Sequence, residues 1–172
     1  MKSIKQIILL FAAGIFTWNA TAQKTLDIVD VAAASKAHTT LVAAVQAADL
    51  VATLKSKGPF TVFAPTNDAF AQLPAGTVET LLKPENKAKL AGILTYHVVS
   101  GTLDSKAVLA AIKKGNGEAV LTTVAGGKLT AGLENGKVIL TDEKGGKATV
   151  TATDLKASNG VIHVVSSVLL PM

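Results

Sequence analysis

The hydrophobic pattern of the chain changes its period near residue 118, and this change restricts the fold more than any other sequence feature. Before it, apolar side chains recur at helical spacing, as at positions i, i+3, i+4 and i+7 in the series Leu90, Ile93, Leu94 and His97. Beyond it, apolar and polar side chains alternate, as in residues 128–133, which is the pattern of a half-buried strand. Glycine-containing pairs typical of tight turns separate the alternating runs, at 126–127, 135–136 and 145–146. The sequence therefore predicts an α+β fold, with a helical first half followed by antiparallel hairpins.

The last apolar stretch, VIHVVSSVLLP, has hydrophobic residues on both faces for most of its length. A strand with this pattern is covered on both sides, so we expect it to be central in its sheet. Hydrophobic residues make up 49% of the chain but aromatic residues only 4%, so the core must consist mainly of aliphatic side chains. This composition favours a sheet with helices packed on it.

The first 22 residues have the pattern of a secretory signal peptide. Two lysines precede an uncharged apolar stretch at residues 7–16, and the small-x-small sequence Ala20-Thr21-Ala22 follows. The apolar stretch is shorter than the ~20 residues of a membrane-spanning helix, so we expect no transmembrane segment. We therefore predict a signal peptide at 1–22 and a single domain at 23–172, located outside the cytoplasm: in the periplasm, secreted or at the cell surface.

The composition argues against several classes of function. The chain has no cysteine, which excludes disulfides and cysteine-based metal sites. Without the two lysines of the signal peptide, 15 lysines stand against 12 acidic residues, a net charge of +3, and there is no arginine. Because nucleic-acid recognition relies on arginine and clustered positive charge, we expect no nucleic-acid partner. The three histidines, His38, His97 and His163, do not have the spacing of ligands on one metal ion, and we predict no cofactor.

Three stretches stand out from the rest: TVFAPTNDAF at 61–70, YHVVSG at 96–101 and NGVIHVVSSVLLP at 159–171. In this order and separation they resemble the fasciclin (FAS1) domain, over residues 25–171, and the chain is similar to its single-domain secreted bacterial members. The resemblance implies a wedge-like sandwich of about seven strands in two packed sheets, with several helices along one side. It also implies a non-catalytic module for adhesion, whose partner is a surface or matrix protein or polysaccharide. We predict that the domain is a monomer.

The same resemblance indicates which residues could take part in adhesion. In animal members of the family the Tyr-His stretch is associated with integrin binding, so Tyr96 and His97 become the candidate adhesion motif. The helical periodicity, however, places His97 on the buried face of its helix.

Two other functions are compatible with the residues. An extracytoplasmic binding protein would hold a small apolar or sugar-like ligand in a pocket between the helices and the sheet. A hydrolase would need a serine beside a histidine and a carboxylate, for which the candidates are Ser100, Ser166, His97, His163 and Asp68. The hydrolase is the weakest hypothesis, because the chain has no G-x-S-x-G motif and nothing indicates an oxyanion hole.

The polar residues Thr66, Asn67 and Asp68 follow a strand that is predicted to end at Pro65. A helix start leaves backbone N–H groups without partners, and each costs about 1–3 kcal/mol if it is buried unsatisfied. We therefore expect one of the three to cap the next helix and another to reach a neighbouring segment, with His97 as the expected contact that ties 61–70 to the Tyr-His stretch. Replacing Asp68 by Ala is expected to lower the melting temperature clearly.

Polar residues at other helix starts and turns are also expected to have structural roles. Thr39 or Thr40 is predicted to cap one helix, and Asp104 or Ser105 another. In the third stretch, the residues assigned a structural role are Asn159, Gly160 and His163.

Overall fold

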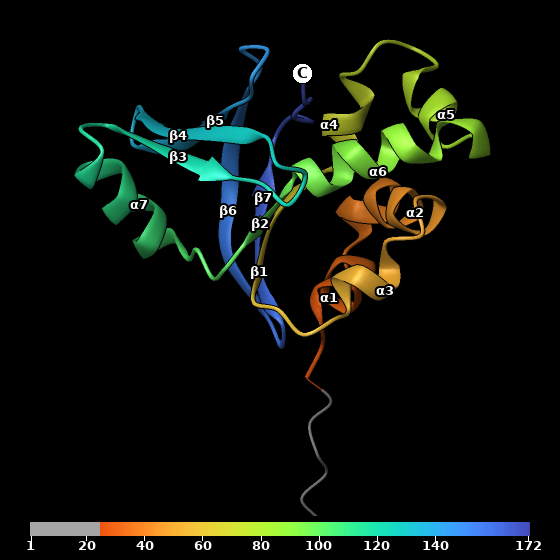
Figure 1. The fold of residues 1–172 in the computed structure, drawn as a ribbon, viewed down its shortest axis with the longest axis horizontal. Helices are drawn as coiled ribbons and strands as arrows, with labels where there is room; N and C mark the ends of the chain where they lie inside the picture. Colours follow the sequence, from red (N-terminus) through yellow and green to blue (C-terminus); the bar gives the residue numbers. More distant parts are fainter. Residues whose placement is uncertain (1–24) are drawn as a thin grey trace, which may run out of the picture.

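The computed structural model describes residues 25–172, so the predicted signal peptide lies outside the described residues. This part of the chain contains seven α-helices and one mixed sheet of seven strands (Figure 1). The α+β class predicted from the change of hydrophobic period is confirmed.

The seven strands are hydrogen-bonded in the order β2-β1-β7-β6-β5-β4-β3. Their bounds are β1 Phe60–Pro65, β2 Val98–Ser100, β3 Glu118–Thr122, β4 Lys128–Glu134, β5 Lys137–Thr141, β6 Lys147–Ala157 and β7 Gly160–Val165. Strands β3 to β7 form consecutive antiparallel hairpins, as predicted. Strand β7 lies between β6 and β1, and it pairs with β1 in parallel. The prediction of a central last strand is therefore confirmed.

Strand β6 connects the two halves of the sheet. Its residues 147–149 pair with β5 and its residues 150–157 pair with β7, and the register of the β6–β7 pairing shifts twice between residues 150 and 155. At the far ends of the sheet, a single bridge joins Val99 of β2 to Thr123, just after β3. The sheet thus folds over on itself into a nearly closed sandwich, which is the two-layer arrangement expected of the fasciclin fold.

Most of the helices cover one side of this sandwich. Their bounds are α1 Ile28–Ala34, α2 Thr39–Ala47, α3 Val51–Leu54, α4 Asn67–Ala71, α5 Thr77–Leu81, α6 Lys87–Tyr96 and α7 Ser105–Lys114, with 3-10 turns at Lys36–His38 and Pro84–Asn86. Figure 1 shows α7 on the opposite side from the other helices, and it packs against β3 and β4. The side chain of Asp104 accepts a hydrogen bond from the Ala107 N–H at 2.7 Å, so the predicted cap of α7 is confirmed.

No single described helix is long and apolar enough to cross a membrane. Helix α1 and the helical segment 36–47 would together be long and apolar enough, but they are bent by 105° relative to each other.

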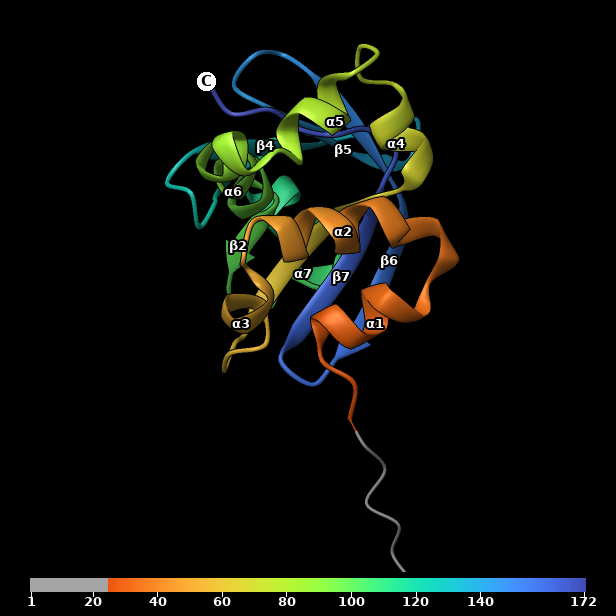
Figure 2. The same cartoon turned by 90° about the vertical axis from the view of Figure 1, so that its right-hand side faces the viewer.

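Two hydrophobic clusters form the core. One lies between the helical layer and one face of β1 and β7, and it includes Val62 and Ile162. The other lies inside the sandwich and includes Phe63 and Val165. Figure 2 shows α1 and α2 in front of β7. Because alternate residues of the same strand enter different clusters, both faces of β1 and β7 are buried, which explains their nearly continuous apolar sequences.

Candidate functional site

Two of the three polar residues after β1 act within or beside α4. Thr66 is the cap of this helix, because its Oγ1 accepts a hydrogen bond from the Ala69 N–H at 3.2 Å. Asp68 is exposed to solvent in the first turn. The prediction that one residue of the trio caps the next helix is confirmed for Thr66. An exposed Asp68 offers no buried contact to lose, so the stability loss predicted for its replacement has no structural basis.

Asn67 reaches a neighbouring segment, but not the predicted one. Its Oδ1 accepts a hydrogen bond from the Thr40 N–H at 3.0 Å, and its Nδ2 donates to the Lys36 carbonyl at 2.9 Å. The prediction that it bonds to His97 was therefore wrong. The prediction that Thr39 or Thr40 caps α2 was also wrong. The residue at the cap position is His38, and its side chain makes no capping hydrogen bond. Asn67 instead supplies the acceptor that the start of α2 needs.

His97 is buried and connects α6 to the C-terminal segment. Its Nδ1 lies 2.8 Å from the Ile93 carbonyl, and its Nε2 accepts from the Leu169 N–H at 3.0 Å. A ring that donates at one nitrogen and accepts at the other is the neutral form of imidazole. Burial lowers the pKa of His97 to about 4, although the bond to Ile93 and the charge of Asp142 oppose this decrease. The predicted position of His97 on a buried helix face is confirmed.

Tyr96 is also buried, with 0% of its surface exposed. Its hydroxyl donates to the Lys128 carbonyl at 2.7 Å and accepts from the Glu143 N–H at 3.2 Å. Burial raises the pKa of this hydroxyl. A partner cannot contact Tyr96 or His97 directly in this fold. The assignment of these two residues to adhesion stays an untested prediction, and any such contact must involve the surface around them.

His163 joins β7 to the segment before α7. Its Nε2 lies 2.6 Å from the Leu103 carbonyl, its Nδ1 accepts from the Asp154 N–H at 3.4 Å, and its ring stacks on Phe63 with centroids 5.6 Å apart. Hydrogen bonds from the hydroxyl and backbone of Ser105 hold the pKa of Asp154 below its usual range. These contacts fix the His163 ring to the backbone of two neighbouring segments.

None of the proposed serine–histidine pairs is formed. The rings of His97 and His163 are bonded to backbone groups, and Ser166 Oγ accepts from the Thr149 N–H at 3.1 Å. Between residues 25 and 172, no three His, Asp or Glu side chains converge as the ligands of a metal ion would. In this part of the chain, the serine and histidine side chains that do meet are those of Ser35 and His38, with Oγ 2.8 Å from Nδ1, and they were not among the proposed pairs.

Asn159 ties together three segments that are distant in the sequence. Its Oδ1 accepts from the Ile28 N–H at 3.0 Å, and its Nδ2 donates to the carbonyls of Leu54 at 2.6 Å and Ser56 at 3.0 Å. The start of α1, the end of α3 and the β6–β7 turn are therefore fixed by one side chain.

Two glycines allow the turns before β1 and β7 to touch. A Cβ atom on Gly160 would lie 2.1 Å from the Phe60 carbonyl oxygen, and one on Gly58 would lie 2.0 Å from the Asn159 carbonyl oxygen. These distances are too short for any side chain. Since Phe60 and Gly160 are the first register pair of the parallel strands, both turns lie at the same end of the sheet.

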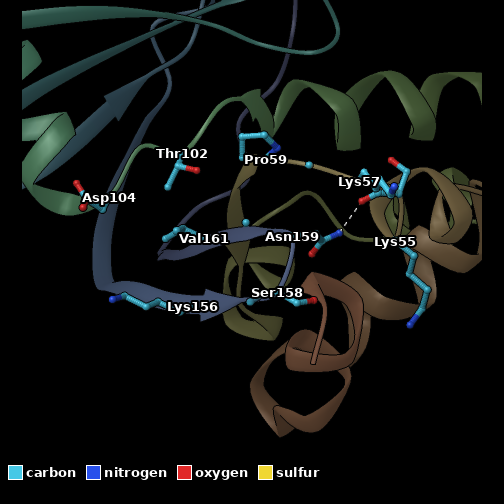
Figure 3. Close-up of a pocket in the computed structure, with 13 residues that line it drawn as sticks. Lys55, Lys57, Pro59, Thr102, Asp104, Lys156, Ser158, Asn159 and Val161 are labelled. Carbon is cyan, nitrogen blue, oxygen red and sulfur yellow. Dashed lines mark hydrogen bonds between the residues drawn. The ribbon is translucent and has the colours of Figure 1, made fainter. Parts of the chain in front are cut away.

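An open cleft of about 790 Å³ lies where these two turns meet (Figure 3). Its size falls within the range of about 300–1,000 Å³ that is usual for ligand pockets. It is lined by residues 55–59 and 156–161, with Thr102 and Asp104. Sequence reasoning assigned Asn159 and Gly160 to structure alone and missed the cleft. The two turn signals, Gly58-Pro59 and Asn159-Gly160, were visible, but their proximity depends on the β1–β7 pairing.

The lysines that line the cleft differ in their electrostatic surroundings. Lys55 bonds to Asp27 at 2.8 Å and to Asp30 at 2.7 Å, and these hydrogen bonds raise its pKa. Burial by itself would raise the pKa of Asp27. The hydrogen bond from Lys55 acts in the opposite direction, and the pKa of Asp27 lies below its usual value. Lys57 and Lys156 are exposed and take part in none of the salt bridges of the described residues. Figure 3 shows their side chains on opposite sides of the cleft.

A second, apolar cavity lies between the helices α1 and α2 and the strands β1 and β7. Its volume is about 30 Å³, and its lining is aliphatic or aromatic apart from His97. A space of this size holds about one water molecule. A small apolar ligand would fit only if the helices moved away from the sheet.

Comparisons with known proteins agree with this architecture. The family model described as the Fasciclin domain matches residues 36–171. The chain is 54% identical over 153 residues to Protein sll1483 of Synechocystis, covering 88% of this chain and 77% of that protein. It is 38% identical over 144 residues to the transforming growth factor-beta-induced protein ig-h3 of Sus scrofa, covering 84% of this chain but 19% of that protein.

A solved structure shows the same fold. It is a FAS1 domain pair from the insect cell adhesion molecule Fasciclin I, with a TM-score of 0.57 and 23% sequence identity, and the match covers 73% of this chain and 42% of that one. The three sequence stretches, the nearly closed sandwich and the family match over most of the chain lead to one conclusion: this chain belongs to the fasciclin domain family.

Proposed function

We propose that this protein is an exported, non-catalytic adhesion or interaction module that binds a surface or matrix protein or polysaccharide. The fasciclin family is known for adhesion and for interaction with the extracellular matrix. The proposed module acts as a single domain, as a monomer, outside the cytoplasm. Its partner binds to the exposed surface at the cleft end of the sheet.

The observation that carries the proposal is a difference in solvent exposure between the buried histidines and the polar side chains of the cleft. His97 and His163, the two histidines considered for acid–base chemistry, are bonded to backbone atoms inside the fold. The cleft, by contrast, is open to solvent and has charged and hydroxyl side chains along its walls. A surface of this kind supports binding without turnover.

The test combines localisation with retention. Fractionation of the producing cells should recover the chain outside the cytoplasm, without its first 22 residues. The purified protein should then be retained on envelope or extracellular matrix fractions, more strongly than an exported control protein of similar size and net charge. Protease treatment of the fractions would remove a protein partner, and periodate oxidation would remove a polysaccharide. Equal retention of both proteins would refute the proposal.

The two alternative functions have less support. The apolar cavity of about 30 Å³ is too small for the proposed apolar or sugar-like ligand, so that hypothesis depends on an opening of the helical layer. A hydrolase built on the proposed pairs would need Ser100 or Ser166 brought to His97 or His163, whose rings are bonded to backbone groups. Turnover of an ester or glycoside that is lost on replacing His97 or His163 in a folded variant would revive it.

A further inference from the structure

The cleft at the end of β1 and β7 has polar side chains with free bonding capacity. Lys57 and Lys156 are exposed ammonium groups outside the salt bridges of the described residues, and Thr102 and Ser158 are exposed hydroxyl groups. Asn159, in contrast, uses its amide for the three segments around it. A ligand in the cleft would therefore meet mainly ammonium and hydroxyl groups.

The apolar part of the cleft restricts the class of partner. It consists of Pro59, Ala157 and Val161, and no aromatic residue lines the cleft. Protein interfaces concentrate their binding energy in aromatic and arginine anchors that fill pockets, and the cleft offers neither. A neutral sugar would find no aromatic ring on which to stack. Charge and hydrogen bonding must therefore supply most of the affinity.

We propose that this cleft binds an acidic polysaccharide, with carboxylate or sulfate groups at Lys57 and Lys156 and sugar hydroxyls at Thr102 and Ser158. The inference rests on the proposed function and narrows its partner to one chemical class. Two ammonium groups on opposite sides of a cleft suit a polymer that carries repeated negative charges, because successive acidic groups can engage both sides (Figure 3).

The negative charges around the cleft refine this picture. Asp27 and Asp30 are bonded to Lys55, so this group of three carries a net charge of −1 and does not attract an acidic ligand. Asp104 also lines the cleft, and its Oδ1 caps α7 through the Ala107 N–H. Its carboxylate repels an acidic ligand. Asn is as good a helix cap as Asp, so Asp104→Asn removes the negative charge while the cap is kept.

The test measures binding of the purified protein to polygalacturonate by isothermal titration calorimetry at low salt. The double variant K57Q/K156Q should bind about tenfold more weakly, because two charge-assisted contacts are lost. The variant D104N should bind about two- to threefold more tightly, because a repulsive charge is removed. The control K83Q/K89Q changes the same net charge at exposed residues outside the cleft, and its affinity should equal that of the wild type.

Further arms separate the possible outcomes. Added salt should weaken binding of polygalacturonate, and neutral dextran should not bind. The inference is overturned if neither polygalacturonate nor dextran sulfate binds, or if the cleft variant and the control variant lose affinity equally. It is also overturned if D104N weakens binding. If K57Q/K156Q is retained on envelope fractions as strongly as the wild type, the cleft is not the binding site, but the proposed function still stands. If the wild type itself is not retained, the proposed function is refuted.

Discussion

Acidification should destabilise this protein well above the pH at which its carboxylates titrate, because of His97. The folded state needs the neutral ring, since Nε2 must accept a hydrogen bond from the Leu169 N–H. Folding lowers the pKa of His97 from 6.5 to about 4, so the unfolded chain binds the proton more tightly. The stability contributed by the neutral ring is therefore complete above pH 6.5 and is lost as the pH falls toward 4.

The magnitude follows from the two pKa values. At about 1.4 kcal/mol per pKa unit, the difference between 6.5 and about 4 corresponds to a total loss of about 3 kcal/mol, most of which is reached at pH 4.5. The lowered pKa values of Asp27 and Asp154 act in the same direction, but only below their ordinary value near 3.8. Measurements that stop at pH 4.5 therefore report mainly histidine.

The assay is urea unfolding, followed by circular dichroism, at several pH values from 7 to 4.5. The reference variant is His97→Asn, whose amide can still donate to the Ile93 carbonyl but does not titrate. Burial also lowers the pKa of His38, but His38 is present in both proteins and cancels in their difference. The wild type should lose about 2–3 kcal/mol more than the variant.

Two results would refute this reasoning. One is an equal loss, within about 0.5 kcal/mol, in the wild type and the variant, which is the scatter expected of independent sites. The other is a proton NMR titration in which the His97 ring takes up a proton near pH 6.5 while the protein stays folded. Either result would mean that the bond between α6 and the C-terminal segment does not require the neutral ring.

Three further predictions concern the turns and caps. Asn159→Ala removes three hydrogen bonds to distant segments and should lower the free energy of unfolding by about 2–4 kcal/mol; a loss below about 1 kcal/mol in urea unfolding would contradict this. Asn67→Ala should lower the free energy of unfolding by about 1–3 kcal/mol, and Asp68→Ala, at an exposed residue, by less than about 0.5 kcal/mol. If thermal unfolding shows the reverse order, the start of α2 does not depend on Asn67. Gly160→Ala should cost more than about 3 kcal/mol or prevent folding, because the new Cβ would meet a carbonyl oxygen at 2.1 Å. Gly92→Ala is the control, because no atom lies within 4 Å of its new Cβ, and it should stabilise α6 by up to about 1 kcal/mol. If the two glycine variants unfold at similar temperatures, the close approach at Gly160 is contradicted.

The elements of the fold could be predicted because their signals are local. Helical spacing around Leu90 and alternation around Leu129 depend only on neighbouring residues, and both agree with the structure. The cap by Asp104 is equally local, because donor and acceptor are three residues apart. The three family stretches added the sandwich architecture, which local patterns could not define.

The candidate site could not be predicted, because it depends on contacts between distant residues. The partner of Asn67 lies 27 residues away, and Asn159 bonds to an N–H 131 residues away. No periodicity encodes such distances. Lys57 belongs to an ordinary polar turn, and Lys156 lies near the end of strand β6. Only the pairing of β1 with β7 brings them to the same cleft.

The parallel pairing of β1 with β7 also determines when the chain can fold. Strand β1 has two neighbours, the three-residue strand β2 and the last strand β7, whose first residue pairs with a residue near the start of the domain. Closing so long a loop costs entropy that is recovered only when the whole pairing forms. A nascent chain that ends before residue 160 thus lacks the strand on which its helices pack. The sheet and the helical layer on it can therefore be completed only once residues 160–165 are available for pairing.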